Sequence, residues 1–387
     1  SPSSGASIAS SSVTLNWTPY NFSSDPTCNV SRNSTIVFSG ICTNDAACTT
    51  TNTIAGGFYL WNVACYSGEE SAVSEIRNFT INVILSPEIA FVSPTPANGA
   101  STPNASVKVN VSVSEANLDT FKFNWDGTDY SYYDNSLIFA LNLDNNAAIG
   151  ESSTKAVDVS KYGNNGTING ATWAANGKWN GAMNFDGYNN YIGAGNFSSG
   201  PSGTMMVWIK PSGTYTDEQV ILGALASNGA DASSRYVIVA KGYCVNGEWS
   251  TSLPNGGSGY QAACSGQPYN STHFPAGAWA QLAVTYNGSI VKFYKDGLLI
   301  NTVSQTVSGA GDAQPFSVGR FGALAGPRRY YYDGSIDEVR IWNRSLSAAE
   351  VQQYYSSNLR KYDSSECHFE AIQGNVASGA YSYFVWA

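Results

Sequence analysis

GAYSYFVWA (Gly379–Ala387), at one end of the chain, repeats the pattern of GFYLWNVAC (Gly57–Cys65) near the other end. Both stretches are rich in aromatic residues and contain a valine, a composition that favours a strand, and we interpret each as a penultimate strand of a sandwich. The segments that open the two copies are also alike, because SPTPANGA (Ser93–Ala100) echoes SPSSGA (Ser1–Ala6). We infer a duplicated module whose second copy begins near residue 87 and is interrupted before its later strands.

Short strands separated by turns characterise the first copy, for example Val13–Trp17, Thr35–Phe38 and Arg77–Val83. This regular spacing of short strands and turns is typical of a small immunoglobulin-like sandwich. We therefore predict an all-β chain with an immunoglobulin-like domain at 1–86, a second, split one at 87–135 plus 358–387, and an inserted domain at 136–357. The alternative is a plain string of three domains in which 358–387 is a tail.

Composition agrees with this class and excludes one kind of partner. The 387 residues include only 12% charged side chains but 38 glycines and 24 tyrosines, which suits strands and turns better than helices. The formal charge is −9, and lysine and arginine are scattered apart from Arg328-Arg329 and Arg360-Lys361. A nucleic-acid partner is therefore not expected.

Seven cysteines occur without any Cys-x-x-Cys pair, and the only histidines are His273 and His368. A zinc site is hard to assemble from this set, so we predict disulfides. We expect a bridge between sheets for Cys28–Cys65, a local loop closed by Cys42–Cys48, and a third bridge for Cys244–Cys264. Cys367 is left over, either for an intermolecular bridge or as a buried free thiol.

Asn-x-Ser/Thr sequons are dense, and with paired cysteines they favour a secreted or cell-surface glycoprotein over a chance pattern. No 18-residue apolar run is present, so we expect no membrane span in this sequence, and its first residues read like mid-chain material that has lost a leader. The sequons lie at Asn16, Asn21, Asn29, Asn33, Asn78, Asn104, Asn110, Asn165, Asn196, Asn270, Asn287 and Asn343.

The inserted segment carries several motifs in order. DVSKYGNNGT (Asp158–Thr167), AMNFDGYNNYI (Ala182–Ile192) and DGSIDEVRIWNRSLSAAE (Asp333–Glu350) resemble the laminin-G-like, concanavalin A-like jelly rolls of bacterial and archaeal surface proteins. The resemblance covers most of the insertion and implies a prokaryotic, by its pattern archaeal, multidomain surface protein. Ser347 and Glu350 form a capping box that predicts a short helix, and Asp296-Gly297 predicts a tight hairpin.

By this resemblance the inserted domain binds glycans or proteins, and some family members bind calcium. Asp186, Asn190 and Asp337 stand in family turns where oxygen ligands gather, so we expect Ca²⁺ as a possible cofactor there. The alternative is that Asp186 and Asn190 cap their own turn through backbone hydrogen bonds.

The loop around Gly326–Asp333 combines hydrogen-bond donors with aromatic faces that can stack on sugars. We name Arg328, Arg329, Tyr330 and Tyr332 as candidate ligand-binding residues, although strand alternation places at least one of the tyrosines in the core.

Catalysis is not expected. A retaining glycosidase needs two carboxylates about 5 Å apart, and the adjacent pairs Asp337-Glu338 and Asp217-Glu218 would point to opposite faces of a strand. His273 lies in an expected loop and His368 beside Cys367, so neither is assigned to a serine-histidine pair.

The second module lacks a counterpart of the strand Arg77–Val83, which leaves the edge at Tyr381, Tyr383 and Val385 without a partner. Such an edge is a template for strand addition. Two functions follow: a non-enzymatic adhesin whose jelly roll binds glycans or neighbouring surface proteins, or a structural subunit of an extracellular filament or surface layer that self-assembles by strand donation.

Overall fold

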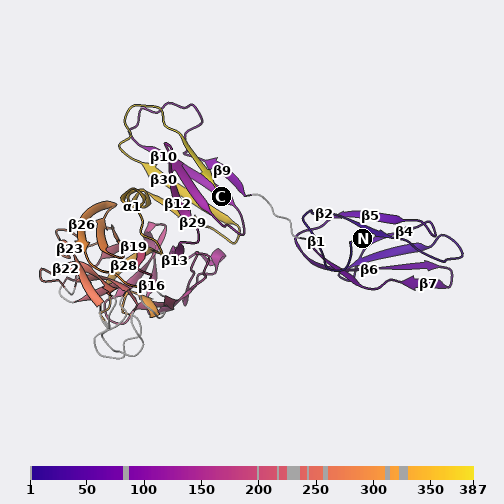
Figure 1. Cartoon of the computed structure of the whole chain (residues 1–387), viewed down its shortest axis with the longest axis horizontal. Coiled ribbons are helices and arrows are strands. Elements are labelled where there is room, and N and C mark those ends of the chain that lie inside the picture. The colour runs from indigo at the N-terminus through magenta and orange to yellow at the C-terminus, as the bar shows by residue number, and fades with distance from the viewer. Residues whose placement is uncertain are drawn as a thin grey trace. The chain divides into compact units, whose positions relative to one another are not determined.

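The computed structural model describes residues 2–81, 87–197, 200–215, 218–224, 236–241, 244–255, 260–309, 314–321 and 330–387. The chain divides into two compact units, Ser1–Ser86 and Pro87–Ala387 (Figure 1). Regular structure is almost entirely β-strand, so the predicted all-β class is confirmed. Within the described ranges, no helix combines the length and the apolar character needed to cross a membrane.

The first unit is a sandwich of two sheets. The larger sheet has the order β1-β8-β6-β3-β4, with β7 also paired to β6, and the smaller sheet is β2-β5. The core between them includes Leu15, Val30, Trp61 and Phe79. The strands are β1 (Ala6–Ile8), β2 (Ser12–Trp17), β3 (Thr27–Arg32), β4 (Thr35–Ile41), β5 (Cys48–Thr53), β6 (Gly57–Ser67), β7 (Glu70–Val73) and β8 (Arg77–Ile81).

Two of the three predicted disulfides lie in this unit, Cys28–Cys65 and Cys42–Cys48. The prediction that Cys28–Cys65 joins two sheets is wrong. Cys28 and Cys65 are direct cross-strand partners on β3 and β6 of the same sheet, with Cα atoms 4.0 Å apart. The sequence did not reveal this because Cys28 lies within a strand, β3, that turn spacing alone did not predict.

The second unit begins with a sandwich built from both ends of its segment. One sheet has the order β29-β30-β10-β9 and the other β12-β11-β31, so strands from either side of the long insertion alternate. Figure 1 shows β30, from the yellow end of the chain, beside the purple β10. The strands are β9 (Glu88–Val92), β10 (Val107–Ser114), β11 (Phe121–Trp125), β12 (Thr128–Tyr133), β29 (Ser357–Lys361), β30 (Glu366–Gln373) and β31 (Tyr383–Trp386).

The two sandwiches pair their strands in the same register. In the first, Arg32 of β3 lies opposite Trp61 of β6, and in the second, Trp125 of β11 lies opposite Tyr383 of β31. Trp61 and Tyr383 also take the same place in the two aligned stretches that begin at Gly57 and Gly379. The split sandwich therefore uses its C-terminal strand as the first unit uses β6, while the immunoglobulin-like assignment of both sandwiches stays a prediction.

The inserted segment forms two eight-stranded sheets. The β28 sheet has the order β16-β17-β28-β19-β24-β25-β26 with β13 also paired to β28, and the β20 sheet has the order β14-β15-β18-β27-β20-β21-β22-β23. The strands of the β28 sheet are β13 (Leu137–Leu141), β16 (Thr172–Trp179), β17 (Gly181–Asp186), β19 (Ser202–Pro211), β24 (Ala280–Asn287), β25 (Ile290–Lys295), β26 (Leu298–Ser304) and β28 (Asp333–Trp342). Those of the β20 sheet are β14 (Lys155–Ala156), β15 (Gly166–Asn169), β18 (Tyr191–Phe197), β20 (Gln219–Ala224), β21 (Tyr236–Lys241), β22 (Glu248–Pro254), β23 (Tyr260–Pro268) and β27 (Gln314–Val318).

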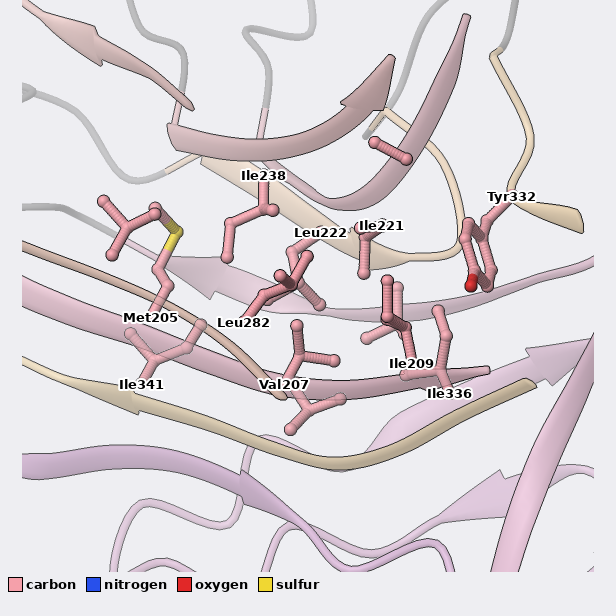
Figure 2. Close-up of a cluster of buried hydrophobic side chains, with 14 of the residues drawn as sticks. Met205, Val207, Ile209, Ile221, Leu222, Ile238, Leu282, Tyr332, Ile336 and Ile341 are labelled. Atoms are coloured by element: carbon pink, nitrogen blue, oxygen red, sulfur yellow. The ribbon is translucent and has the colours of Figure 1, made fainter. Parts of the chain in front are cut away.

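The core of the jelly roll lies between these sheets. Figure 2 shows Val207 and Ile336 from the β28 sheet facing Leu222 and Ile238 from the β20 sheet. The predicted hairpin is present, since Asp296 and Gly297 both have positive φ, +51° and +77°, as a tight turn between β25 and β26 requires. A 3₁₀ turn, η1 (Ala147–Ile149), follows β13.

The predicted helix is present as α1 (Ala348–Tyr355), and Ser347 and Glu350 form its capping box. Its buried face, with Tyr354, joins a second core that contains Trp342 from the jelly roll and Phe121 and Phe369 from the split sandwich. The Tyr354 hydroxyl donates to the Ser131 carbonyl at 2.6 Å. The insertion and its host thus share one core on the outer face of the β28 sheet.

Candidate functional site

The turn between β17 and β18 is organised by Asp186. Its Oδ1 accepts the backbone N–H groups of Tyr188, Asn189 and Asn190 at 2.9, 3.0 and 3.2 Å. Partial burial opposes ionisation, but these hydrogen bonds outweigh it and lower the pKa of Asp186. The turn consequently holds the Tyr188 ring out from the protein, 78% exposed.

The same turn meets the loop that was predicted to bind ligands. Gly187 N–H donates to the Tyr332 carbonyl at 3.0 Å, and Tyr332 N–H donates to the Gly319 carbonyl at 2.9 Å. Next to Gly319, the Arg320 guanidinium lies over the Tyr191 ring, 3.3 Å from its centroid. We call Tyr188, Asn189, Tyr191 and Arg320 the rim cluster.

The four candidate ligand-binding residues of this loop differ in their environments. Arg328 and Arg329 lie outside the described residues. Tyr332 is 0% exposed among the jelly-roll core residues in Figure 2, and burial raises its pKa well above the usual range. Its assignment as a ligand-binding residue is wrong, because alternation along the chain turns it inward. Tyr330 is half-buried and packs edge-on against Phe321, 5.6 Å between ring centroids.

Of the three predicted calcium ligands, Asp186 and Asn190 share one turn, but Asp337 lies apart from them. Asp186 is Cα partner to Asp333 at the start of β28, whereas Asp337 lies four residues farther along that strand, beside Trp208 of β19. Asn190 sits over Gly170, its Oδ1 only 2.1 Å from where a Cβ on that glycine would be. Asp186 Oδ1 is used by the turn and Asp337 is not part of it, so the three predicted residues do not form one cation site.

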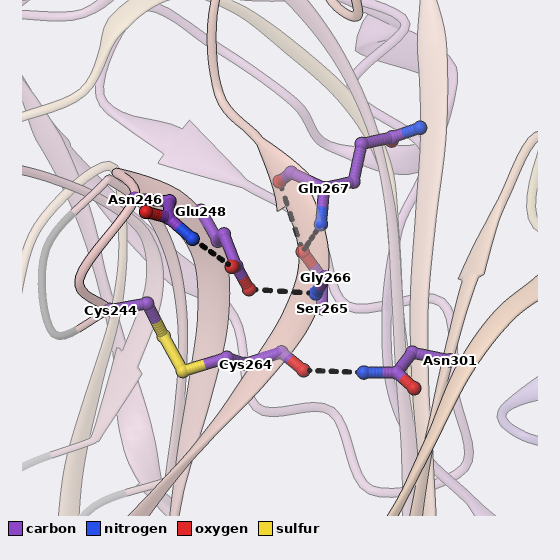
Figure 3. The surroundings of a disulfide bond; sticks show 8 residues. All are labelled: Cys244, Asn246, Glu248, Cys264, Ser265, Gly266, Gln267 and Asn301. Atoms are coloured by element: carbon purple, nitrogen blue, oxygen red, sulfur yellow. Dashed lines mark hydrogen bonds between the residues drawn. A yellow bond between two sulfur atoms is a disulfide. The ribbon is translucent and has the colours of Figure 1, made fainter.

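In the described part of the chain, one group of metal-ligand side chains converges, Cys244, Glu248 and Cys264. Its two sulfur atoms are bonded to each other in the third predicted disulfide. Glu248 accepts from the Gly266 N–H at 2.7 Å, and Figure 3 shows both interactions. The disulfide ties the segment before β22 to β23, and its sulfurs are not available as thiolate ligands.

Asp337 and Glu338 depart from simple alternation. Between the pairs Trp208–Asp337 and Met206–Arg340, β28 carries one residue more than β19, and Glu338 has a φ of +50°. Ile336 and Val339 both belong to the inner core, so this β-bulge leaves Asp337 and Glu338 on the outer face together. The prediction that they point to opposite faces is wrong, because strand alternation fails at a bulge.

Both carboxyls are nevertheless buried, Asp337 under the backbone of Lys178 and Trp179 and Glu338 against β29 of the split sandwich. Burial raises the pKa of Glu338 to about 7, against the opposing charge of Arg340, whose Nη2 lies 2.8 Å from Glu338 Oε2. Burial and the Glu338 charge raise the pKa of Asp337 well above its usual range. Asn358 of β29 donates to Glu338 Oε1 at 2.6 Å. A polysaccharide cannot reach this pair.

The histidines are engaged in local contacts. His273 Nδ1 lies 3.1 Å from Asn270 Oδ1. His368 Nε2 lies 2.9 Å from Glu366 Oε1, and the Ser112 hydroxyl donates to that same carboxylate at 2.9 Å rather than to the imidazole. This arrangement does not provide a histidine base for the Ser112 hydroxyl.

Cys367 is a buried free thiol. It lines a cavity of about 110 Å³ between the split sandwich and the jelly roll, together with Tyr133, Leu137 and Leu359. Burial raises the pKa of Cys367 to about 11 and that of Tyr133 to about 12. Of the two possibilities left open by the sequence, the structure favours the buried free cysteine over an intermolecular bridge.

Eight of the twelve sequon asparagines are exposed, Asn16, Asn21, Asn33, Asn104, Asn165, Asn196, Asn287 and Asn343, and the other four are half-buried, Asn29, Asn78, Asn110 and Asn270. The residues predicted to form a strand-donation edge lie on or just before β31. β31 pairs with β11 on one side, and no other described strand pairs with it. Tyr383 and Val385 pack towards the shared core, while Tyr381 stacks on Trp125 at 5.6 Å.

Comparison with known families tests the resemblance. Residues 185–352 match the model of the concanavalin A-like lectin/glucanases superfamily. The predicted family resemblance is thereby confirmed for this part of the insertion. No curated protein matches the sequence.

Three solved structures illustrate a partial likeness to this chain. Domain 4 of AbnA, a GH43 extracellular arabinanase from Geobacillus stearothermophilus in complex with arabinotriose, is 20% identical with a TM-score of 0.42, covering 56% of this chain and 97% of that chain. A botulinum neurotoxin type C structure is 13% identical with a TM-score of 0.40, covering 57% of this chain and half (50%) of its own. The Ruminococcus gnavus IT-sialidase CBM40 bound to α2,3 sialyllactose is 15% identical with a TM-score of 0.32, covering 40% and 82%.

Sequence reasoning missed most of the rim cluster. Tyr188 and Tyr191 stand inside the quoted motif Ala182–Ile192, and an exposed aromatic residue in a family turn was a usable signal. Arg320 gave no signal, because its place over Tyr191 depends on the pairing of β18 with β27, which are far apart in sequence.

Proposed function

We propose that this protein is a non-enzymatic, extracellular surface glycoprotein whose jelly roll binds glycans or neighbouring surface proteins through the rim cluster. The proposal is supported chiefly by the exposed Tyr188 ring, held out by the Asp186 turn within residues that match a lectin/glucanase superfamily. An aromatic face can cover the apolar side of a sugar ring, and amide and guanidinium groups suit its hydroxyls.

The rim cluster offers these groups side by side. Asn189 is exposed next to Tyr188 in the turn, and Arg320 is positioned by its contact with the Tyr191 ring. Backbone hydrogen bonds to Asp186 fix the turn, so little conformational entropy is lost when a ligand orders it. A shallow site of this kind suits a surface-exposed sugar more than a buried substrate.

The non-enzymatic part of the proposal rests on the acidic residues. Asp337 and Glu338 are the carboxylates that the bulge brings onto one face, and both are buried, at 0% and 1% exposed. An extracellular location is supported by three disulfides, which persist in oxidising compartments, and by the exposed sequon asparagines.

A glycan array tests the binding proposal. The full chain should bind a defined set of glycans, and Tyr188→Ala should weaken binding at least tenfold, because the ring is the largest exposed apolar surface of the rim cluster. Tyr20→Ala is a matched control, since Tyr20 is 77% exposed in the first unit. Equal binding by the two variants, or no binding by the wild type, would contradict the proposal.

A second function, assembly through strand addition, is favoured by one observation. In the first unit, β8 pairs along β6 and buries Phe79 and Ile81. β31 takes the place of β6 in the split sandwich, yet within the described residues its second edge carries no strand. An extended segment with alternating apolar residues, such as β8 has, would fit that edge.

Sedimentation across a wide concentration range, followed by electron microscopy, tests this second function. Strand addition predicts oligomers or filaments that lose their order when Phe384, which is 46% exposed on β31, is replaced by lysine, with the Ile76→Lys variant as a surface control on an exposed residue of the first unit. A chain that stays monomeric at every concentration would refute self-assembly and leave the glycan-binding proposal untouched.

A further inference from the structure

The outer face of the larger sheet in the first unit is apolar. Alternation along β6 turns Trp61 and Val63 into the core and leaves Phe58 and Leu60 facing outward. Single exposed apolar residues need no explanation, but a set gathered on one face marks a surface that something covers. The set, which we call the apolar face, is 43% to 75% exposed and consists of Ile36 and Ile41 of β4 and Phe58, Leu60 and Tyr66 of β6.

The outer face of the smaller sheet in the same sandwich is polar. Thr14 pairs with Thr51, and Asn16 pairs with Thr49. The two hydroxyls of the first pair lie 2.8 Å apart. Water satisfies hydroxyl and amide groups of this kind without any further cover. The apolar face is therefore a special feature of the larger sheet, and it requires its own explanation.

Two sequon asparagines flank Leu60 on the apolar face. Asn78 of β8 is the cross-strand partner of Leu60, and Thr80 of the same sequon pairs with Phe58. On the other side, Asn33 in the turn between β3 and β4 donates its N–H to the Leu60 carbonyl and accepts the Leu60 N–H on Oδ1, both at 2.9 Å. Cross-strand side chains lie about 5 Å apart. A sugar on either asparagine consequently starts beside Leu60.

Both asparagines present the atom to which a sugar is attached. Oδ1 of Asn33 is held by the hydrogen bond just given, and Oδ1 of Asn78 accepts the Gly5 N–H at 2.7 Å. Neither Nδ2 atom forms a hydrogen bond with any residue that the structure describes. Thr35 and Thr80, which complete the two sequons, are exposed. The two side chains are thus fixed through oxygen and left open at nitrogen.

We propose that N-linked glycans on Asn33 and Asn78 lie across the apolar face and cover Leu60 and Phe58. The apolar side of a sugar ring can pack on aliphatic and aromatic side chains, while its hydroxyls face water. This inference rests on the proposed status of the chain as a glycoprotein, but it does not depend on the rim cluster. The glycans here are the chain's own, and they stand on the first unit.

A protein partner, such as a second copy of the chain, is the competing occupant of the apolar face. Bulky glycans that start on both sides of Leu60 would keep a protein surface away from it. The two occupants therefore exclude one another. Removal of the glycans should uncover the face if sugars cover it, and should leave its exposure unchanged if a protein does.

The experiment uses the full chain secreted by a host that attaches N-linked glycans. Glycopeptide mass spectrometry reports which asparagines carry sugar, and the fluorescence of the dye ANS together with sedimentation reports exposed apolar surface. The double variant Thr35→Ala, Thr80→Ala removes both sequons and keeps both asparagines with their hydrogen bonds. It should raise ANS emission roughly threefold or more, or cause self-association that the wild type lacks.

Two variants serve as matched controls. The double variant Thr35→Ser, Thr80→Ser keeps both sequons, and Thr18→Ala removes the sequon of Asn16 on the polar sheet, so both should behave as the wild type. Adding Phe58→Ser and Leu60→Ser to the double alanine variant should return ANS emission to the wild-type level, which locates the dye. Circular dichroism shows that each variant is folded, and trimming the folded wild type with an endoglycosidase gives the same comparison without a substitution.

The outcomes separate this inference from the proposed function. Sugar at other sequons with Asn33 and Asn78 bare overturns the inference alone, whereas an absence of sugar at every sequon also contradicts the proposed glycoprotein. The inference is likewise overturned if both asparagines carry sugar and its loss changes neither ANS emission nor association. A wild type that sediments as a dimer, with ANS emission that does not depend on the two glycans, would assign the apolar face to a second copy.

Discussion

Phe369→Ala is the change that most sharply tests whether the residues after the insertion complete the split sandwich. Phe369 of β30 is 1% exposed and packs against Phe121, Phe123 and Tyr132 at centroid distances of 5.1, 5.0 and 4.7 Å. All three partners precede the insertion. If 358–387 were a tail, the ring would contribute little.

The size of the effect follows from the burial. Replacing a fully buried phenylalanine by alanine costs about 3–5 kcal/mol of unfolding free energy, and three ring contacts place Phe369 at the upper end, about 4–5 kcal/mol. A unit of this length unfolds with an entropy of about 0.6 kcal/mol/K, so the melting temperature should fall by about 6–8 °C.

Differential scanning calorimetry of the full chain is the assay. The transition of the second unit should shift and that of the first should not, because Phe369 belongs to a core formed within Pro87–Ala387. Ile372→Ala is the matched control on the same strand, since Ile372 is 39% exposed. A shift for Phe369→Ala no larger than that of the control would refute the split sandwich.

Three further predictions concern single groups. Burial raises the pKa of Glu151 to about 7, above its ordinary 4.5, so the contribution of this group to stability is present below pH 4.5 and is lost as the pH rises through 7. Glu151→Gln should therefore flatten the decline in the unfolding free energy between pH 5 and 8, measured in EDTA. An unchanged slope would contradict the burial of this group. Cys367 should not react with Ellman's reagent in the native chain and should release one thiol in guanidinium without reductant, whereas a disulfide-linked dimer on a non-reducing gel would show that the thiol is paired. Ser347→Ala removes the hydroxyl that accepts the Glu350 N–H at 3.2 Å, and it should lower the unfolding free energy by about 1 kcal/mol in urea denaturation. Ser347→Asp keeps an acceptor and should stay close to the wild type. Equal losses of unfolding free energy in both variants would contradict the capping role of Ser347.

The features that sequence predicted best were those fixed by local chemistry. The capping box at Ser347 and Glu350 and the Asp296-Gly297 hairpin depend on a few neighbouring residues, and both are present. The family resemblance could also be recognised from the sequence, because the closing motif Asp333–Glu350 is long and its residues follow the family's pattern. The all-β class followed from composition and turn spacing.

The features that sequence missed depend on pairing between distant strands. Cys28 and Cys65 lie in one sheet because β3 and β6 are neighbours, which no local pattern reveals. The bulge at Glu338 exists only in relation to β19, so alternation along β28 gave the wrong faces for Asp337 and Glu338. The rim cluster likewise requires β18 and β27 to meet before Arg320 can lie over Tyr191.

Hydrogen exchange with and without a glycan selected from the array tests the central claim most directly, because it locates the bound ligand on the chain. Binding at the rim cluster predicts slower exchange in peptides that contain the Asp186–Tyr191 turn and Arg320, with the first unit unchanged. Protection confined to the other peptides, with the turn exchanging as fast as in the free protein, would contradict the assignment of glycan binding to this rim.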